Sequence, residues 1–260
     1  MKKTLFVILL LTVLLGCTNA KEFYSRQENE IKQQIYSQPE VAVAVPDLIT
    51  GEFLTQDNKK IVYSFYENKN AKFAVILLHM LDRNRHEWDK FAKLLQTAGY
   101  SALSIDLRGH GNSTKEWRWR AFSERDFRAM TLDLNAAKEF LKTKNFEQFV
   151  IIGASIGANT ALNYGVIEPA VKAIVLISPG LDHRGIKIEE SILKNNKPTL
   201  LIASEEDLYA LTTSKEIFDK TTNKIKDYRY YKEAGHGTDI FKKERADLLI
   251  LDWLVQKEFR

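Results

Sequence analysis

The sequence predicts an α/β fold in which a mostly parallel central sheet of about eight strands carries helices on both faces. The first observation is that continuous apolar runs, typical of buried parallel strands, alternate with stretches that are apolar at every third or fourth residue. The second is that polar residues suited to catalysis follow these runs, at the strand ends where open α/β sheets bind ligands. No large lid domain is expected. The length suits a single α/β domain.

Residues 1–16 have the composition of a secretory signal peptide. Two lysines, Lys2 and Lys3, precede an apolar run, Leu5–Leu15, that is too short to span a bilayer comfortably. The run ends in Leu-Leu-Gly followed by Cys17, which resembles the lipobox of bacterial lipoproteins. That resemblance implies cleavage before Cys17 and acylation of its sulfur and new amino group. The alternative is an ordinary signal peptide with a free thiol nearby.

Residues 17–46 are expected to form a lipidated polar tether, and residues 47–260 a single α/β domain. Two or more acyl chains anchor a protein stably, where a single chain does not. The product would be tethered to a membrane of the bacterial cell envelope and would not span it. Thr18 is not the Asp associated with inner-membrane retention. The expected placement is therefore the outer membrane where there are two membranes, and the cell surface where there is one.

The charge and cysteine content exclude several classes of function. The chain has 38 Lys and Arg against 34 Asp and Glu, and the leader accounts for two of the lysines. This mild excess and the lack of a basic block argue against nucleic acid as a partner. Cys17 is the only cysteine, so no intrachain disulfide can form. Histidines other than His236 show no ligand spacing, so neither a metal nor a cofactor is expected. The oligomeric state is not predicted.

The elements follow in a regular order. Residues 52–55 and 60–66 are expected to form an opening hairpin, joined by the turn-forming Asp57-Asn58. The further strands are predicted at Phe73–Leu78, Ser101–Ile105, Phe149–Ile152, Ala173–Ile177, Thr199–Ala203 and, shorter, Arg229–Tyr231. The helices are predicted at Glu87–Ala98, Glu124–Leu141, Ile156–Gly165, Thr213–Lys220 and Asp239–Val255. The segment between Ser178 and Pro198 is too short for a substantial lid.

A nucleophile elbow is predicted at Gly153-Ala154-Ser155-Ile156-Gly157. A G-x-S-x-G pattern arises by chance in roughly one chain of this size in ten. Here it stands directly after a predicted buried strand and before a predicted helix, which is the context the motif requires. The glycines are needed because bulkier neighbours would clash with the adjoining strand and helix. Ser155 is therefore the candidate nucleophile, and a helix-capping serine is the alternative.

His236 and Asp207 complete a candidate catalytic triad with Ser155. His236 lies between two glycines on a loop, where a near-neutral imidazole can take and return a proton. A surface-loop histidine is the alternative. Asp207 ends a predicted strand and would orient the imidazole. Glu205 and Glu206 directly precede it, and both remain alternatives for the triad acid.

An oxyanion hole needs two backbone N–H groups, one following the nucleophile and one from the loop after the strand that ends at Leu78. Ile156 is the candidate for the first. Leu81 is the candidate for the second, with Met80 as the alternative. His79 is expected to be structural, with its ring bonded to the loop.

These motifs together resemble the α/β-hydrolase family across roughly residues 50–257. Besides the elbow, residues 106–113, Asp-Leu-Arg-Gly-His-Gly-Asn-Ser, are similar to a recurring family segment, D-x-R-G-x-G-x-S, whose role there is structural. Met80 stands where the family usually has glycine. The oxyanion loop and the Ser178-Pro179-Gly180 turn resemble the smaller bacterial esterases and the dienelactone-hydrolase-like branch. The namesake of that branch uses a cysteine nucleophile, whereas this chain has serine.

The resemblance implies a serine hydrolase that cleaves carboxylic esters of small to medium acyl groups through an acyl-enzyme on Ser155. Thioesterase, amidase or peptidase, and C–C hydrolase activities on the same triad remain alternatives, as does a catalytically idle binding protein of the envelope. Met80, Trp117 and Trp119 are candidate substrate contacts, although the tryptophans and Phe122 would equally pack over the sheet edge. Four arginines flank the same loops and could hold a substrate carboxylate: Arg83, Arg85, Arg118 and Arg120.

Overall fold

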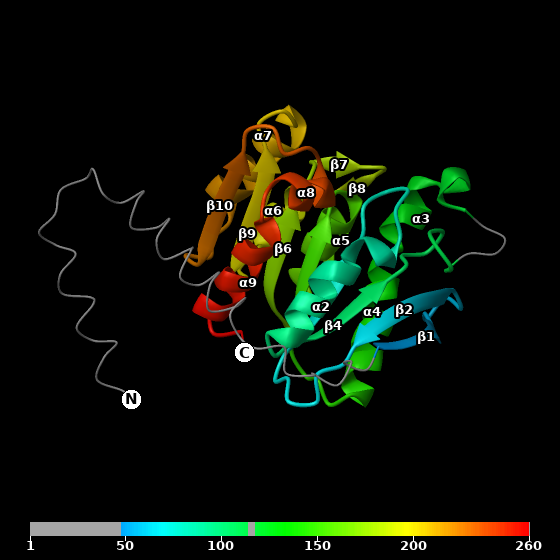
Figure 1. Cartoon of the computed structure of the whole chain (residues 1–260). Coiled ribbons are helices and arrows are strands. Elements are labelled where there is room, and N and C mark those ends of the chain that lie inside the picture. Colours follow the sequence, from blue (N-terminus) through cyan, green and yellow to red (C-terminus); the bar gives the residue numbers. More distant parts are fainter. Residues whose placement is uncertain (1–47, 114–117, 260) are drawn as a thin grey trace, which may run out of the picture. The chain divides into compact units, whose positions relative to one another are not determined.

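The computed structural model describes residues 48–113 and 118–259 (Figure 1). The predicted signal peptide, Cys17, the tether and Trp117 lie outside these residues. The described chain forms a main sheet of eight strands in the order β1-β2-β4-β3-β5-β6-β9-β10. Their bounds are β1 Leu48–Leu54, β2 Lys60–Tyr66, β3 Ala74–Leu78, β4 Ser101–Ile105, β5 Phe149–Ala154, β6 Val171–Ile177, β9 Thr199–Ser204 and β10 Lys226–Tyr231.

The sheet is mostly parallel, which confirms the predicted fold class. Only the pairings of β2 with β1 and with β4 are antiparallel. From β4 to β10 every neighbouring pair is parallel. The carboxyl ends of β3, β5, β6, β9 and β10 therefore lie at one edge of the sheet, and the loops that follow them carry the candidate catalytic residues.

Helices cover both faces, because alternate residues of each buried strand point to opposite sides. On one face, Ile76 of β3 and Ile151 of β5 belong to a core with residues of α4 (Thr131–Thr143), α5 (Ile156–Gly165), α6 (Glu189–Lys194) and α7 (Leu208–Lys220). On the other face, Val75 and Val150 belong to a core with residues of α2 (Asp89–Thr97) and α9 (Ala246–Gln256). Both faces are apolar, so the sequence shows continuous runs where a half-exposed sheet would alternate.

Two of the predicted helices are broken in the structure. The stretch 124–141 forms α3 (Glu124–Arg128) and α4, because bonds between residues three apart replace the helical pattern around Ala129 and Met130. The stretch 239–255 forms a short 3₁₀ turn (η4, Gly237–Asp239), α8 (Ile240–Lys243) and α9, since Glu244 is extended between the last two. In both cases the apolar stripe continues across the break, which is why the sequence pattern reads as one helix.

Other boundaries shift for local reasons. Helix α7 begins five residues before its predicted start, because the Asp207 side chain caps it by accepting from the Ala210 N–H at 3.2 Å. The first residues of the predicted 87–98 helix belong to a 3₁₀ turn, η2 (Arg85–Trp88), and the α-helix itself, α2, begins at Asp89. Short elements unforeseen from the sequence are β7 (Asp182–His183), β8 (Ile186–Lys187), α6 and η3 (Trp119–Ala121). Each is too short to show a period. No lid domain is evident, since β7, β8 and α6 account for the regular structure between β6 and β9.

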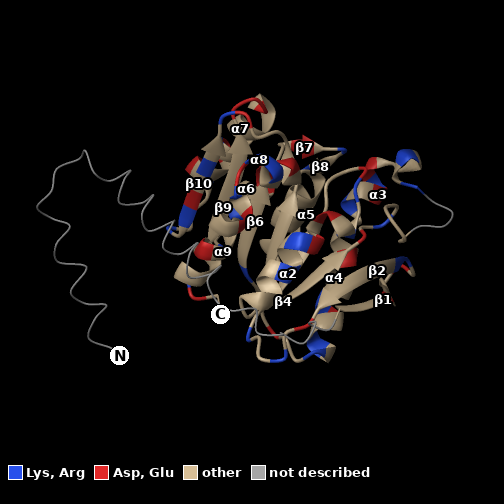
Figure 2. Cartoon of the chain, in the orientation of Figure 1, with Lys and Arg blue, Asp and Glu red and all other residues tan. Residues whose placement is uncertain are grey.

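Charged side chains of both signs are interleaved over the helices and loops, while the central strands carry almost none (Figure 2). Among the described residues, no helix combines the length and the apolar character that crossing a bilayer would require.

Candidate active site

Ser155 occupies a strained turn between β5 and α5. Its φ of 54° and ψ of −118° lie in a region that side-chain-bearing residues rarely adopt. The turn is held by its backbone, because the Ser155 N–H donates to the Ile177 carbonyl at 2.8 Å and its carbonyl accepts from Ala158. A Cβ at Gly153 would lie 2.2 Å from the Gly157 carbonyl oxygen. The sequence-predicted elbow is thus formed, with a side chain only 6% exposed.

Asp207 and His236 are brought together by the loops after β9 and β10. Asp207 Oδ2 lies 2.5 Å from His236 Nδ1, and its other oxygen accepts from the Ala210 N–H. Burial would raise the pKa of Asp207, but the bonds from His236 and Ala210 outweigh it and lower that pKa. Glu205 and Glu206 are exposed, and Glu206 faces Lys243 at 3.7 Å. Of the three adjacent acids, Asp207 is the one hydrogen-bonded to the histidine.

The loop after β10 that carries His236, residues 232–239, lies against the elbow, and we call it the histidine loop. The N–H of Gly237 donates to the Ser178 hydroxyl at 2.9 Å, and a Cβ at Gly237 would lie 3.6 Å from that of Ala154. The residue after His236 therefore packs beside the residue before Ser155. Among the described residues, no hydrogen bond joins the Ser155 hydroxyl to His236, whose side chain is 42% exposed. Ser178 was seen in the sequence only as part of a turn, and its anchoring role was missed.

In the candidate oxyanion loop, residues 79–81, the backbone N–H of Leu81 is free among the described residues and that of Met80 is not. The Met80 N–H donates to Glu87 Oε1 at 2.9 Å, so it is already engaged. Within the described residues, no acceptor lies on the backbone N–H of Leu81 or of Ile156. The Met80 side chain is buried, and its sulfur would lie 2.2 Å from a Cβ at Gly237. Met80 is therefore a packing residue between the two loops.

Glu87 joins the oxyanion loop to the histidine loop, a role without any signal in the sequence. One carboxyl oxygen accepts from Met80, and the other lies 3.1 Å from Oγ1 of Thr238, two residues after His236. Burial raises the pKa of Glu87 to about 7, although the bonds from Met80 and Thr238 oppose this. The Glu87 carboxyl therefore changes its charge near neutral pH while it is hydrogen-bonded to both the oxyanion loop and the histidine loop.

The pH dependence of stability is expected to report this carboxyl. Because the folded pKa of about 7 exceeds the ordinary 4.5, the folded protein retains the proton longer than the unfolded chain. The free energy of unfolding should then fall as the pH rises through that window, by up to roughly 3 kcal/mol at 1.36 kcal/mol per pKa unit. In Glu87→Gln, which keeps an acceptor for Met80, the fall should be smaller by this amount, while the buried Asp133, whose pKa burial raises to about 6, still contributes a fall of its own.

Urea unfolding at pH 5, 6, 7 and 8 measures this effect. Glu189→Gln, at an exposed position on α6, is the matched control and should keep the parent's slope. Equal slopes in the Glu87→Gln and parent proteins would contradict the assignment.

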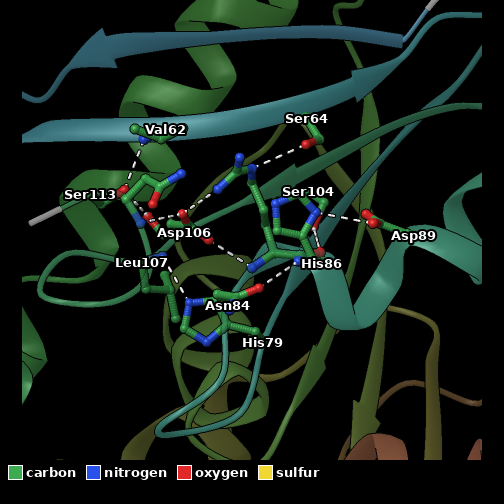
Figure 3. Close-up of polar contacts among 12 residues, drawn as sticks. Val62, Ser64, His79, Asn84, His86, Asp89, Ser104, Asp106, Leu107 and Ser113 are labelled. Atoms are coloured by element: carbon green, nitrogen blue, oxygen red, sulfur yellow. Dashed lines mark hydrogen bonds and ion pairs between the residues drawn. The ribbon is translucent and has the colours of Figure 1, made fainter.

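The histidine at the start of the oxyanion loop is structural. His79 is fully buried, and its Nδ1 lies 2.7 Å from the Met80 carbonyl. Its Nε2 accepts from the Leu107 N–H at 3.0 Å (Figure 3). A carbonyl can only accept, so Nδ1 carries the proton and the ring is neutral. Burial, with His110 nearby, lowers the pKa of His79 to about 3. Both nitrogens are engaged with the backbone, in keeping with the sequence prediction.

The loop after β4 is held by Asp106, as the resemblance implied. The buried Asp106 carboxylate accepts from the Arg85 N–H, from the Arg85 guanidinium and from the Asn112 N–H at 2.6–2.7 Å. Its carbonyl accepts from the Ser113 hydroxyl, which in turn accepts from Val62 of β2 (Figure 3). Arg85 is thus a buried structural residue, and its expected place among substrate-facing arginines is wrong.

A pocket of about 260 Å³ lies beside the oxyanion loop. It is lined by residues 82–84, 109–111 and 118–120. Trp119 lines it with its ring stacked on that of His110, at 5.8 Å between centroids and 6° between planes. Phe122 instead packs edge-on against Phe127, as the packing alternative predicted. In residues 48–113 and 118–259, no three His, Cys, Asp or Glu side chains are grouped to hold a metal ion.

Comparisons with known proteins agree with this fold. Residues 74–195 match the family model described as the alpha/beta hydrolase fold. Over 96 residues the chain is 33% identical to a fluoroacetate dehalogenase from a Burkholderia species, an alignment that covers 37% of this chain and 30% of that protein. The chain thus spans under a third of that curated relative.

Solved structures support the fold over a longer stretch. A dienelactone hydrolase from Anabaena variabilis superimposes with a TM-score of 0.69 at 20% identity, covering 82% of this chain and 98% of that one. An esterase from Pyrococcus furiosus gives 0.64 at 19% identity, covering 81% and 92%. At these identities the likeness establishes the architecture, and the chemistry has to be argued from the site.

Proposed function

We propose that this chain is a serine hydrolase of the α/β-hydrolase family that cleaves carboxylic esters of small to medium acyl groups. The observation that carries the proposal is the Asp207–His236 hydrogen bond of 2.5 Å, formed on a loop that packs against the Ser155 turn. A carboxylate on Nδ1 leaves Nε2 of the ring as the base, which is what a serine nucleophile needs.

The proposed reaction has two stages. In the first, Ser155 Oγ attacks the ester carbonyl carbon while His236 Nε2 takes the hydroxyl proton. The tetrahedral intermediate then collapses, and the same proton passes to the leaving alcohol. In the second, a water molecule gives a proton to His236 and attacks the acyl-enzyme, releasing the acid and restoring Ser155. Asp207 stabilises the imidazolium in both stages.

The negative oxygen of each intermediate would lie between the N–H groups of Leu81 and Ile156. The first lies in the turn after β3 and the second on the first residue of α5, so both donors are already in place when charge develops. Glu87 supports this assignment. Because its carboxylate accepts from the Met80 N–H, the Leu81 N–H is the donor of this loop that is left for the substrate oxygen.

The site favours small esters over long-chain lipids. The chain between β6 and β9 contributes a hairpin of two-residue strands and the six-residue helix α6 above the sheet edge. No element there is large enough to cover a long acyl chain, and His236 is 42% exposed. Short esters such as p-nitrophenyl acetate are therefore suitable first substrates.

Labelling by a fluorophosphonate probe tests the proposed nucleophile. The probe should modify the purified protein once, on the peptide that contains Ser155, and should not modify the Ser155→Ala protein. An unlabelled but folded parent protein would overturn the proposal in favour of a binding role for the fold.

We propose in addition that the protein is lipid-anchored in the cell envelope through Cys17. The support is the leader composition and the Leu-Leu-Gly-Cys ending at Cys17. Palmitate fed to the producing bacterium should label the parent protein and not Cys17→Ser. Equal labelling of the two proteins would overturn this part of the proposal.

A further inference from the structure

We propose that the pocket beside the oxyanion loop is an anion subsite, which gives the enzyme a preference for esters that carry a carboxylate. The inference rests on the proposed function for its substrate class, while the anion site itself stands on the pocket. Asp82 lines the pocket and directly follows Leu81 in the chain, so the pocket adjoins the loop that carries this proposed oxyanion donor.

The lining of the pocket is strongly cationic. Three of its residues are arginines, Arg83, Arg118 and Arg120, and Asp82 is the acid among the lining residues. Arg120 Nη2 lies 3.1 and 3.0 Å from the two oxygens of Asp82, so that pair is neutral. Arg83 has a distant partner, Asp239 at 3.8 Å. In the described part of the chain, the Arg118 side chain makes no ion pair or hydrogen bond. The walls therefore carry an excess of positive charge.

An aromatic stack supports one of the lining arginines, Arg120. Trp119 lies parallel to the buried His110, and the Arg120 guanidinium carbon is 4.5 Å from the centre of the Trp119 ring. Arg184, from the hairpin between β7 and β8, approaches the same ring at 5.8 Å. A guanidinium resting on an aromatic face loses less freedom on binding than one that projects into water.

His110, which also lines the pocket, is neutral, so the positive charge of the lining comes from the arginines. His110 Nδ1 lies 2.9 Å from the Arg108 carbonyl, so it carries the ring proton. Burial lowers the pKa of His110, which keeps the ring neutral. Its Nε2 is buried without a hydrogen-bond partner among the described residues. The attraction for an anion thus comes from guanidinium groups, which stay charged at every working pH.

Carboxylate is the anion that best matches this lining and the proposed reaction. Its two oxygens fit the planar fork of a guanidinium, and such charge-assisted pairs are about twice as strong as neutral hydrogen bonds. The volume of about 260 Å³ holds a short carboxyalkyl chain. The three arginines of the lining surround one hollow.

A matched pair of esters tests the subsite. p-Nitrophenyl hemiglutarate and p-nitrophenyl valerate differ in a terminal carboxylate against a methyl group. At low ionic strength, kcat/KM of the parent above background should be at least about tenfold higher for the hemiglutarate. The preference should fall at least tenfold in Arg118→Gln/Arg120→Gln, and it should also fall in 0.5 M salt. The charge-matched control is Lys224→Gln/Arg229→Gln, which removes two exposed positive charges at and just before β10 and should keep the preference.

Binding of glutarate to the Ser155→Ala protein, measured by calorimetry, separates the two proposals. Binding that is lost in the added Arg118→Gln/Arg120→Gln background supports the subsite even if no ester is hydrolysed, an outcome that would sink the proposed function alone. Parent hydrolysis of both esters at equal kcat/KM, with no glutarate binding, would overturn the subsite and leave the serine hydrolase intact.

Discussion

The Ser155→Ala protein is expected to hydrolyse p-nitrophenyl acetate at least about 10⁴-fold more slowly than the parent, measured as kcat. Removing the nucleophile of such a triad leaves only the acceleration from the oxyanion hole and from binding. Under the proposed mechanism, His236 and Asp207 then have no hydroxyl to activate, so KM should change far less than kcat.

The control for this experiment is Ser191→Ala. Ser191 lies on α6, where its hydroxyl donates to Asn163, and its loss should leave kcat within about twofold of the parent. Both variants should show parent-like unfolding in urea. A Ser155→Ala protein that retained more than a tenth of the parent's kcat would remove the acyl-enzyme from consideration.

Asp207→Asn is expected to lower kcat by roughly 10⁴-fold, because an amide facing Nδ1 permits the wrong imidazole tautomer. The acid's bond to Ala210 can be kept by the Asn carbonyl, so the cap of α7 should survive and the fold with it. The lowered pKa of Asp207 keeps it ionised throughout the pH range of assay, so this loss should be independent of pH.

The neighbouring acids supply matched controls for that substitution. Glu206→Gln and Glu205→Gln remove the same charge one and two residues away from Asp207, and both side chains are exposed. Each should keep kcat within a few-fold of the parent. A large loss in Glu206→Gln, with little in Asp207→Asn, would reassign the triad acid.

The parts of the fold that the sequence predicted best are elements with clear turn residues at both ends. Strand β4 and helix α5 have the predicted bounds, because both lie between clear turn residues and are buried along their length. The break between α3 and α4 left no mark, since Phe127 and Leu134 belong to the same core on either side of it. Periodicity reports which face is buried, and it is insensitive to a single tightened turn.

Some residues of the candidate site could likewise be predicted from the sequence and others could not. Ser155 and His236, the proposed nucleophile and base, can be singled out in the sequence because each stands in a motif that encodes a local backbone shape. Glu87 cannot, because its partner Thr238 lies 151 residues away and their contact exists only after folding. The arginines differ for the same reason: Arg85 and Arg118 look alike in sequence, and only tertiary contacts bury the first beneath Asp106.

The turn at Ser155 has one further consequence, which concerns how such a site can change over evolutionary time. Its unfavourable backbone geometry is maintained by main-chain bonds to Ile177 and Ala158 and by the absence of side chains at Gly153 and Gly157. None of these contacts uses the hydroxyl. The identity of the reactive atom is therefore nearly uncoupled from the energy that holds the turn. A single codon change at this position can alter the chemistry of the scaffold while its architecture is inherited unchanged.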